Sequence, residues 1–424
     1  MFKVNSLSFV NLFQNSLSIF LLLFCISPKF SSFGIILICF SVFFGYYKKE
    51  IFFKFNFPSL LILLLYVIYA IGCIWSSDSS IAFGYLEKKL SFLVFPLIFS
   101  FKTKNQEINL RNPILSFITG VFLLSLLGIW NSLSACFLIT ETSSFLCFSG
   151  TTLSHIHHPT YFSIFHYFSI ILFWYANKNN FKGFTKRRLL IWIIFSCLFQ
   201  FCLMSLSGVL FLNFTILVFL IYFFYKKVTS IKFIVLLLFL TLISFFSYKK
   251  IPYLKDEVQF SIQEVNQYCK SPSNYIYEKK YPFEGNSARL ILWTSSFQVM
   301  LDHPFGVGTG NLDEVLSMKL KDNGQEDFSK LLLNPHNQYL QIGIELGFFG
   351  MMFFIFILFY SIFISLKSSN KVLLFLVLNL SFNSFFESIL QRQSGIVFFV
   401  FWICLFLVYP FSLNSYKEGI SKEK

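Results

Sequence analysis

Charged residues are scarce in this chain of 424 residues. They make up 13% of the sequence, against 56% hydrophobic residues. A soluble domain of ordinary composition carries about twice that share of charge, so that class is excluded. The apolar residues come in runs of 17 to 25, separated by Lys-rich gaps, and runs of this length cross a membrane as helices. The sequence therefore predicts an all-α, multi-span integral membrane protein.

Metal-binding and redox motifs are also missing. The nine cysteines include no Cys-x-x-Cys pair, so no cofactor is expected from them. Cys136 and Cys147 fall in one predicted external loop, where a disulfide and two unpaired thiols remain equally open. The run His155-Ile156-His157-His158 has no carboxylate or thiolate at ligand spacing nearby, so no metal site is predicted there.

Twelve spans are predicted, at approximately residues 7–27, 30–47, 58–75, 90–101 with flanking residues, 113–135, 159–176, 189–206, 208–225, 231–248, 336–366, 371–387 and 394–413. One large hydrophilic segment interrupts them. The predicted divisions are transmembrane helices 1–9 at 1–248, a periplasmic loop at 249–334, transmembrane helices 10–12 at 335–413, and a cytoplasmic tail at 414–424.

Lys and Arg in the short loops set the predicted orientation. With the N-terminus inside, the internal segments hold 20 of them and the short external segments hold 4, which the positive-inside rule favours. An even number of spans then places both termini in the cytoplasm. The net charge of +14 is mostly a topology signal, so no nucleic-acid partner is predicted.

The stretch 334–350 begins polar and ends apolar. Pro335 suits the first turn of a helix, and His336 is expected at its start, where the long hydrophilic segment enters the bilayer. Gly343, Gly347 and Gly350 share one helical face and would let another helix approach closely. A His at a water–membrane boundary suits general-base work. A packing helix whose His only hydrogen-bonds a loop is an equally open interpretation.

This stretch carries a resemblance to a known family. The residues that carry it are His336-Asn337-x-x-Leu340-x-x-x-x-Glu345-x-Gly347-x-x-Gly350. The string resembles the signature of the bacterial O-antigen ligase and O-antigen polymerase superfamily. The order of motifs upstream is also similar to the catalytic loop of that superfamily: Arg289, Trp293, Pro304, Gly306-x-Gly308-x-Gly310-Asn311, and then His336-Asn337.

The glycine run by itself does not indicate a nucleotide site, because no strand precedes it and it is expected outside the cell. A turn that packs the loop against the bilayer is the favoured interpretation, with backbone amides that could help hold phosphate. The charges of Glu87-Lys88-Lys89 are interpreted as interfacial anchors of a helix.

Three further segments resemble parts of the family. His158-Pro159-x-Tyr161 resembles a segment at the external mouth of a span, which implies substrate contacts for His158 and Tyr161. Gly208 stands where many family members carry an Arg that is thought to hold the lipid diphosphate. The turn from Glu387 to Arg392 resembles the last external turn, and Arg392 is the expected substitute cation; a plain Glu387–Arg392 contact is the competing interpretation.

The resemblance implies a GT-C-type glycosyltransferase of the bacterial inner membrane, metal-independent and inverting, with its site facing the periplasm. Such an enzyme moves a glycan from undecaprenyl diphosphate to an acceptor hydroxyl in lipopolysaccharide biosynthesis. His336 is the expected base, and the expected substrate-binding residues are Arg289, Arg392, Asn337, Glu387, His158 and Tyr161.

The acceptor remains open at this stage. A ligase that uses lipid A core is favoured over a polymerase that joins repeat units to another glycan. A multi-span transporter is the alternative from another class, and paired broken helices in two symmetric halves would favour it. The partners expected besides these substrates are membrane lipids.

Overall fold

The computed structural model describes residues 8–104, 108–138, 150–203, 205, 207–215, 252–282 and 285–408. These residues are mostly helical, as predicted. Among them, the strands are β1 (Ile51–Phe53) and β2 (Phe101–Thr103), which pair antiparallel with Ile51 opposite Thr103.

The helices in chain order are α1 Phe9–Ile26, α2 Ser31–Tyr47, α3 Phe57–Gly72, α4 Ser79–Lys88, α5 Ser91–Phe99, α6 Arg111–Leu138, α7 Pro159–Lys178, α8 Lys186–Leu203, α11 Pro252–Lys270, α12 Pro272–Glu278, α13 Gly285–Asp302, α14 Leu312–Asp322, α15 Glu326–Ser329, α16 Gln338–Lys367, α17 Lys371–Asn383 and α18 Gln393–Ile403. A 3-10 turn, Pro28–Phe30, precedes α2, and π-helical turns, Cys404–Val408, follow α18.

Several helices match the predicted spans. Within the described residues, four segments are long and apolar enough to cross a membrane, and they are Phe9–Ile26, Pro28–Tyr47, Arg111–Cys136 and Gln338–Lys367. Shorter apolar helices are Phe57–Gly72, Lys371–Asn383 and Gln393–Val408. The predicted span 231–248 and most of 208–225 lie outside the described residues, so the number twelve stays a prediction.

The predicted span at 90–101 differs from the structure. Helix α5 has 9 residues, which at 1.5 Å per residue covers roughly 13 Å of a hydrocarbon core about 30 Å thick. The helix ends at Ser100, because the next residues form β2 and pair with β1 instead of continuing the helix. This segment is therefore a short buried helix and not a full crossing.

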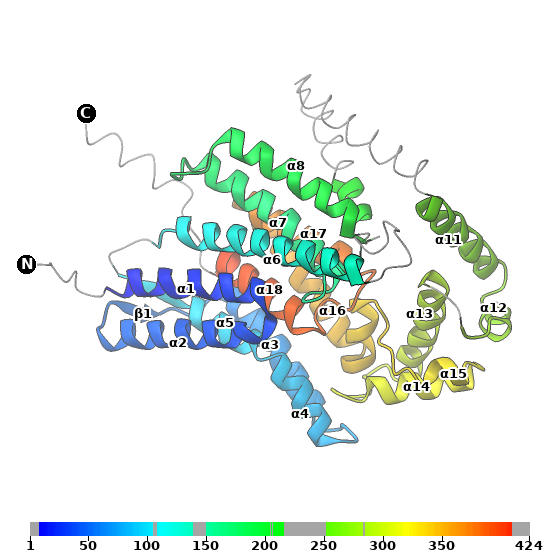
Figure 1. The fold of residues 1–424 in the computed structure, drawn as a ribbon. Coiled ribbons are helices and arrows are strands. Elements are labelled where there is room, and N and C mark those ends of the chain that lie inside the picture. The colour runs from blue at the N-terminus through cyan, green and yellow to red at the C-terminus, as the bar shows by residue number, and fades with distance from the viewer. Residues whose placement is uncertain are drawn as a thin grey trace, which may run out of the picture.

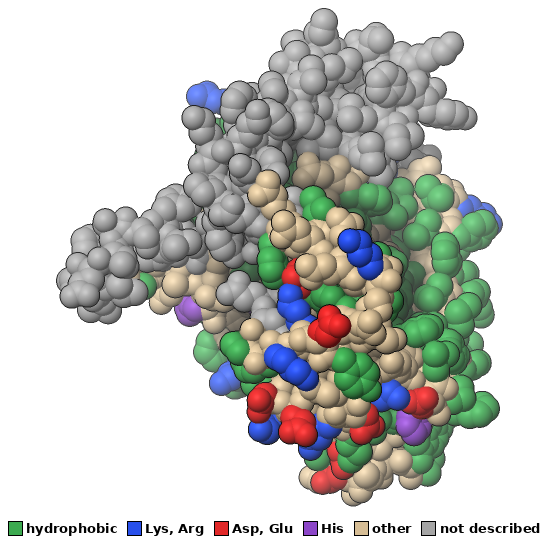
Figure 2. Space-filling view, turned by 90° about the vertical axis from the view of Figure 1, so that its right-hand side faces the viewer, with side chains coloured by type: hydrophobic (Ala, Val, Ile, Leu, Met, Phe, Trp, Pro, Cys, Tyr) green, Lys and Arg blue, Asp and Glu red, His purple; other side chains and the backbone are tan. Residues whose placement is uncertain are grey.

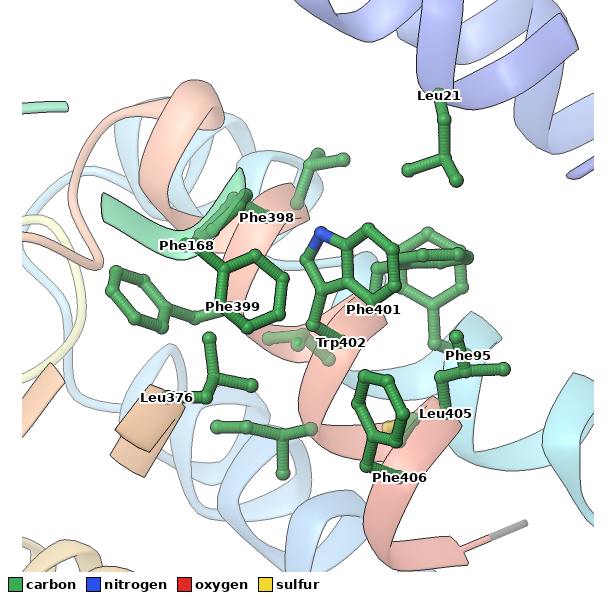
Figure 3. Packing of buried hydrophobic residues seen from close by; sticks show 14 of the residues in the cluster. Leu21, Phe95, Phe168, Leu376, Phe398, Phe399, Phe401, Trp402, Leu405 and Phe406 are labelled. Atoms are coloured by element: carbon green, nitrogen blue, oxygen red, sulfur yellow. The ribbon is translucent and has the colours of Figure 1, made fainter. Parts of the chain in front are cut away.

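The core of the bundle is built from aromatic rings. Residues 394–408, which lie in α18 and the π-helical turns after it, are buried. Their aromatic rings pack against rings of neighbouring helices, and Figure 3 shows Phe398, Phe401 and Trp402 among them. The ring centroids of Phe20 and Phe401 lie 4.8 Å apart, and those of Phe168 and Trp402 lie 5.0 Å apart. Aromatic pairs at such distances add to the stabilisation from burial.

Helix α2 shows which side of the bundle meets lipid. Its side chains Phe33 and Phe43 are 67% and 68% exposed. Large apolar side chains exposed in a row along an apolar helix are unfavourable in water and favourable in hydrocarbon. The exposed face of α2 is therefore expected to contact the acyl chains.

The segments predicted to be internal lie together at one end of the bundle, where they contact one another. The Nε of Arg111 donates to the carbonyl of Lys182 at 3.0 Å, and the Nζ of Lys102 donates to the carbonyl of Val408 at 2.9 Å. These residues belong to loops predicted inside or to a span end that faces them. The pairing of β1 with β2 brings two more predicted internal segments together.

Predicted external segments meet at the other end. The Oγ of Ser76 donates to Oδ1 of Asn311 at 2.8 Å, and the hydroxyl of Tyr161 donates to the carbonyl of Ile389 at 3.3 Å. Figure 1 shows helices α11–α15 at the end of the molecule opposite the start of α1. The contacts agree with the predicted alternation of loops, while the side that faces the periplasm stays a prediction.

Helices α11–α15 form a lobe with a small core of its own. Its buried side chains include Ile291 and Leu292 of α13, Leu316 of α14 and Phe328 of α15. Figure 2, which looks onto this end, shows basic and acidic side chains interspersed, with hydrophobic side chains along one flank. The polar, Tyr-rich first part of this segment forms α11 and α12.

The glycine run joins the lobe to the bundle. Helix α16 is broken at Gly347, whose φ of 71° and ψ of −174° are not helical. The carbonyls of Ile344 and Glu345, freed by the break, accept hydrogen bonds from Val307 N at 2.8 Å and Gly308 N at 3.1 Å. A turn that packs the loop against the bilayer was predicted here, and the structure shows a turn that packs against the backbone of α16.

Two glycines make this contact possible. A Cβ on Gly306 would lie 2.5 Å from the nitrogen of Gly347, and a Cβ on Gly347 would lie 2.4 Å from the carbonyl oxygen of Pro304. The backbones therefore touch directly. The expected role for the amides in holding phosphate is wrong for Val307, Gly308 and Thr309, because all three donate to protein carbonyls.

The orientation can be tested with an exposed native cysteine. Cys269 in α11 is exposed, and Ser368 after α16 is exposed at the opposite, predicted cytoplasmic end. A membrane-impermeant maleimide added to intact spheroplasts should label Cys269, and Cys269→Ser should remove that signal. In the Cys269→Ser background, Ser368→Cys should react only after permeabilisation. Labelling of Ser368→Cys in intact spheroplasts would reverse the orientation.

The helix break gives a prediction about stability. Gly347→Ala should lower the free energy of unfolding by about 1–3 kcal/mol, because Ala resists the positive φ and its Cβ meets Pro304. Gly84→Ala in α4 is the control, since a Cβ there meets nothing within 4 Å and Ala favours a helix. Thermal unfolding in detergent compares the two. If both variants were equally stable, the backbone at residue 347 would accept Ala without strain, and the prediction would be wrong.

Candidate active site

The start of α16 is fixed by Asn337. Its Oδ1 accepts hydrogen bonds from the backbone N–H groups of Tyr339 at 3.0 Å and Leu340 at 3.1 Å, and its Nδ2 donates to the carbonyl of Phe385 at 3.2 Å. Asn337 is therefore the N-cap. The expected helix start at Pro335 and His336 is two residues early, because His336 has φ 47° and lies outside the helix.

The turn after α17 is tied to this helix start. The N–H of Gln338 donates to the carbonyl of Ser384 at 2.7 Å, and its Oε1 accepts from the N–H of Leu390 at 2.6 Å. Gln338 thus fixes both ends of the turn 384–390, one end with its backbone N–H and the other with its buried side chain. This places Glu387, in the middle of the turn, next to His336.

His336 and Glu387 form the central contact of the site. The Nδ1 of His336 lies 3.3 Å from Oε2 of Glu387, and the side chains are 29% and 7% exposed respectively. A hydrogen on Nδ1 donates to the carboxylate and leaves Nε2 with a free lone pair. In the described part of the chain Glu387 forms no ion pair with Arg392, so that competing interpretation is wrong.

Charges from three other segments converge on Glu387. Burial alone would raise the pKa of its carboxyl, but the hydrogen bond and charge of His336 and the charges of His158 and Arg289 outweigh burial and lower it. Glu387 is therefore an anion at neutral pH. Burial, followed by the charges of Arg392, His336 and Arg289, lowers the pKa of His158 in spite of Glu387.

The two arginines lie beside this pair. Arg289 is in the second turn of α13, and its Nη1 donates to Oδ1 of Asn286 at 3.4 Å. Arg392 is exposed at the N-terminus of α18, and within the described residues its guanidinium has neither a hydrogen bond nor a salt bridge. Both guanidinium groups therefore keep most of their donors available for a ligand.

His158 and Tyr161 border the same place from α7. The ring of His158 lies edge-on to that of Tyr161, with centroids 6.3 Å apart. Nδ1 of His158 accepts from Thr160 N at 3.4 Å and so caps α7. The hydroxyl of Tyr161 donates to the carbonyl of Ile389, and the side chain is 1% exposed, so Tyr161 supports the turn from inside the protein.

The neighbouring His157 has a different environment. It is 1% exposed, and its two ring nitrogens lie 3.0 Å from Oγ of Ser394 and 3.1 Å from the carbonyl of Cys25. His157 thus joins the ends of α1 and α18 and is not directed to the site. The run of three histidines is split among separate roles.

Gly208 is packed and leaves no room for a side chain. A Cβ there would lie 2.3 Å from Nε2 of Gln200 and 2.7 Å from Oγ of Ser163, and its carbonyl accepts from Tyr167 at 3.0 Å. An Arg at this position would require another backbone path. The departure from the family pattern is therefore built into the packing of α7 and α8.

Lys89 and Glu345 were not recognised as a group from the sequence. The expectation that Lys89 is an interfacial anchor is wrong, because it is 2% exposed and its Nζ lies 4.4 Å from the ring centroid of Tyr69. Glu345 is fully buried, and its Oε1 accepts from Gln341 at 2.6 Å. The sequence shows Lys89 only as a Lys that precedes an apolar run. The residues near it, Tyr69 of α3 and Glu345 of α16, are far away in the sequence.

The arrangement defines a class of protein. It is a helical membrane protein with a His–carboxylate pair at one end of the bundle, where a membrane helix begins, and two arginines beside it. Such a set can take a proton from a hydroxyl and hold an anionic group at the same time.

Comparison with known families agrees. Residues 160–355 match the model of the O-antigen ligase family, which confirms the resemblance of this chain to the O-antigen ligase and O-antigen polymerase superfamily. A search of curated proteins found no match. The match supports a ligase or polymerase type of function, with a lipid-linked glycan and an acceptor as partners in general. It includes Arg289 and His336, whereas Glu387 and Arg392 lie beyond it.

The His336–Glu387 contact can be tested by Glu387→Gln. The amide keeps the shape but cannot stabilise a positively charged imidazole, so glycan transfer should fall about 10²-fold. The pKa of Glu387 is lowered in the folded protein, so the ionised carboxylate stabilises the wild-type fold at neutral pH. This contribution to the free energy of unfolding is lost as the pH falls through the lowered pKa. Thermal unfolding at pH 7 checks that the variant is folded. Activity within a few fold of wild type would remove Glu387 from the site.

Proposed function

We propose that this protein is a glycosyltransferase that moves a glycan from undecaprenyl diphosphate to a hydroxyl of the lipid A core, at the periplasmic face of the bacterial inner membrane. The observation that carries the proposal is the His336–Glu387 pair, with Arg289 and Arg392 beside it, at the start of the helix that carries the family signature.

His336 acts as the general base. With Nδ1 held by Glu387, Nε2 takes the proton of the acceptor hydroxyl as the oxygen attacks the anomeric carbon. Glu387 stabilises the imidazolium that forms, because it is a buried anion at neutral pH. The proton leaves His336 to the aqueous face, where the side chain is partly exposed.

Arg289 and Arg392 hold the diphosphate. Diphosphate is a good leaving group, and two guanidinium groups supply the positive charge that stabilises its departure. They come from separate elements, α13 and the start of α18. A single displacement with base and leaving group on opposite sides inverts the anomeric centre, and no metal ion is needed for it. His158 borders this centre, and Asn337 and Tyr161, whose polar atoms bond within the protein, hold the helix start and the turn around it.

The acceptor decides between ligase and polymerase. The family description that matches is the ligase, and we take lipid A core as the acceptor. Transport is less well supported, since the charged residues His336, Glu387 and Arg392 lie at one end of the bundle and not at its middle, where transporters bind substrates.

Deletion of the gene and a gel of the surface polysaccharide test the proposal. Loss of a ligase should leave unmodified core and free lipid-linked polymer, and wild type but not His336→Ala should restore the ladder. The substitution removes the base, which costs ~10²–10⁴-fold in rate. Core that bears a single repeat unit would indicate a polymerase. An unchanged gel, or full restoration by His336→Ala at equal protein level, would contradict the proposal.

A further inference from the structure

The first turn of α13, which leads to Arg289, is held against α11. The Nδ2 of Asn286 donates to Oγ of Ser261 in α11, and Oδ1 of the same amide accepts from Nη1 of Arg289 at 3.4 Å. Asn286 and Arg289 are three residues apart and share a face of the helix. One side-chain amide thus links the guanidinium to another helix of the lobe.

The carboxylate of Glu264 in α11 also binds the first turn of α13. This carboxylate is 3% exposed, in a lobe whose other acidic side chains are mostly at the surface. It accepts from Oγ of Ser287 in α13 at 2.6 Å, from Nζ of Lys279 at 2.6 Å, and from the hydroxyl of Tyr275 in α12. One buried group therefore joins α11, α12, the segment after α12 and α13.

The carboxylate is well satisfied as an anion. Burial would raise the pKa of Glu264, but the hydrogen bonds from Lys279, Ser287 and Tyr275 and the charge of Lys279 outweigh it and lower the pKa. Hydrogen bonds to a carboxylate are shorter and stronger than those to a neutral amide at the same place, so a carboxylate with three donors holds its partners more rigidly. Ser287, which it holds, is two residues from Arg289.

The fold of the lobe does not depend on this group alone. Ile291, Leu292, Leu316 and Phe328 form its apolar core together with Tyr275, whose hydroxyl donates to Glu264. A second ion pair of similar length, from Lys319 to Asp302 at 2.8 Å, lies on the surface at the other end of α13. Asp302 thus provides a control at the end of α13 that is far from Arg289.

We infer that Glu264 and Asn286 are positioning residues that aim the guanidinium of Arg289 at the diphosphate. Neither touches the ligand. The inference rests on the proposed function, in which Arg289 binds the donor. It assigns to the buried polar network of the lobe a role in donor affinity and not only in folding.

The test measures binding of undecaprenyl diphosphate to the purified full-length protein in nanodiscs. Glu264→Gln and Asn286→Ala should each weaken binding about tenfold, which is the effect of losing one well-placed charge-assisted contact. Asp302→Asn should bind as the wild type does. Thermal unfolding identifies any variant that is not folded, and Asn286→Ala keeps the test valid if Glu264→Gln does not fold.

A double-mutant cycle separates positioning from a general effect on the lobe. Arg289→Lys removes the planar fork, so Glu264→Gln should cause no further loss in that background. Full additivity, or wild-type affinity of both Glu264→Gln and Asn286→Ala, would overturn the inference while leaving the donor role of Arg289 intact. Wild-type affinity of Arg289→Lys would instead overturn the donor role, and the inference with it.

Discussion

The structure depends on how the break in α16 is satisfied. A membrane helix that is interrupted exposes backbone carbonyls, and these must find donors because hydrocarbon offers none. Here Val307 and Gly308 supply the donors to Ile344 and Glu345. The same hydrogen bonds fix the lobe on the bundle. These main-chain contacts therefore help to set the position of Arg289 in the lobe relative to His336 before α16.

The site is built from the polar residues around the N-terminus of α16. Asn337 satisfies the first N–H groups of α16, and this leaves His336 just outside the helix with its side chain at the aqueous boundary. Gln338 then binds the turn that presents Glu387. The His336–Glu387 pair lies where α16 begins, at the end of the bundle, and the cluster of buried aromatic rings around α18 lies below it.

Much of the membrane part could be predicted from the sequence, because about 20 apolar residues are needed to cross a bilayer whatever the tertiary contacts. Helices such as α1 and α16 follow from this rule. The site residues were predicted individually, but their partners were not. Glu387 meets His336 only because the turn after α17 closes onto Gln338, and no local pattern shows that. Lys89 was misinterpreted for the same reason, since the residues that bury it lie far away in the sequence.

An electron cryo-microscopy map of the protein with undecaprenyl diphosphate, the leaving group of the proposed reaction, tests the central claim most directly. The account predicts density for the diphosphate between the guanidinium groups of Arg289 and Arg392, on the side of His336 that faces away from Glu387. Density for the diphosphate at the opposite end of the bundle, near Lys102 and Arg111, or a bound diphosphate that touches neither guanidinium, would contradict it.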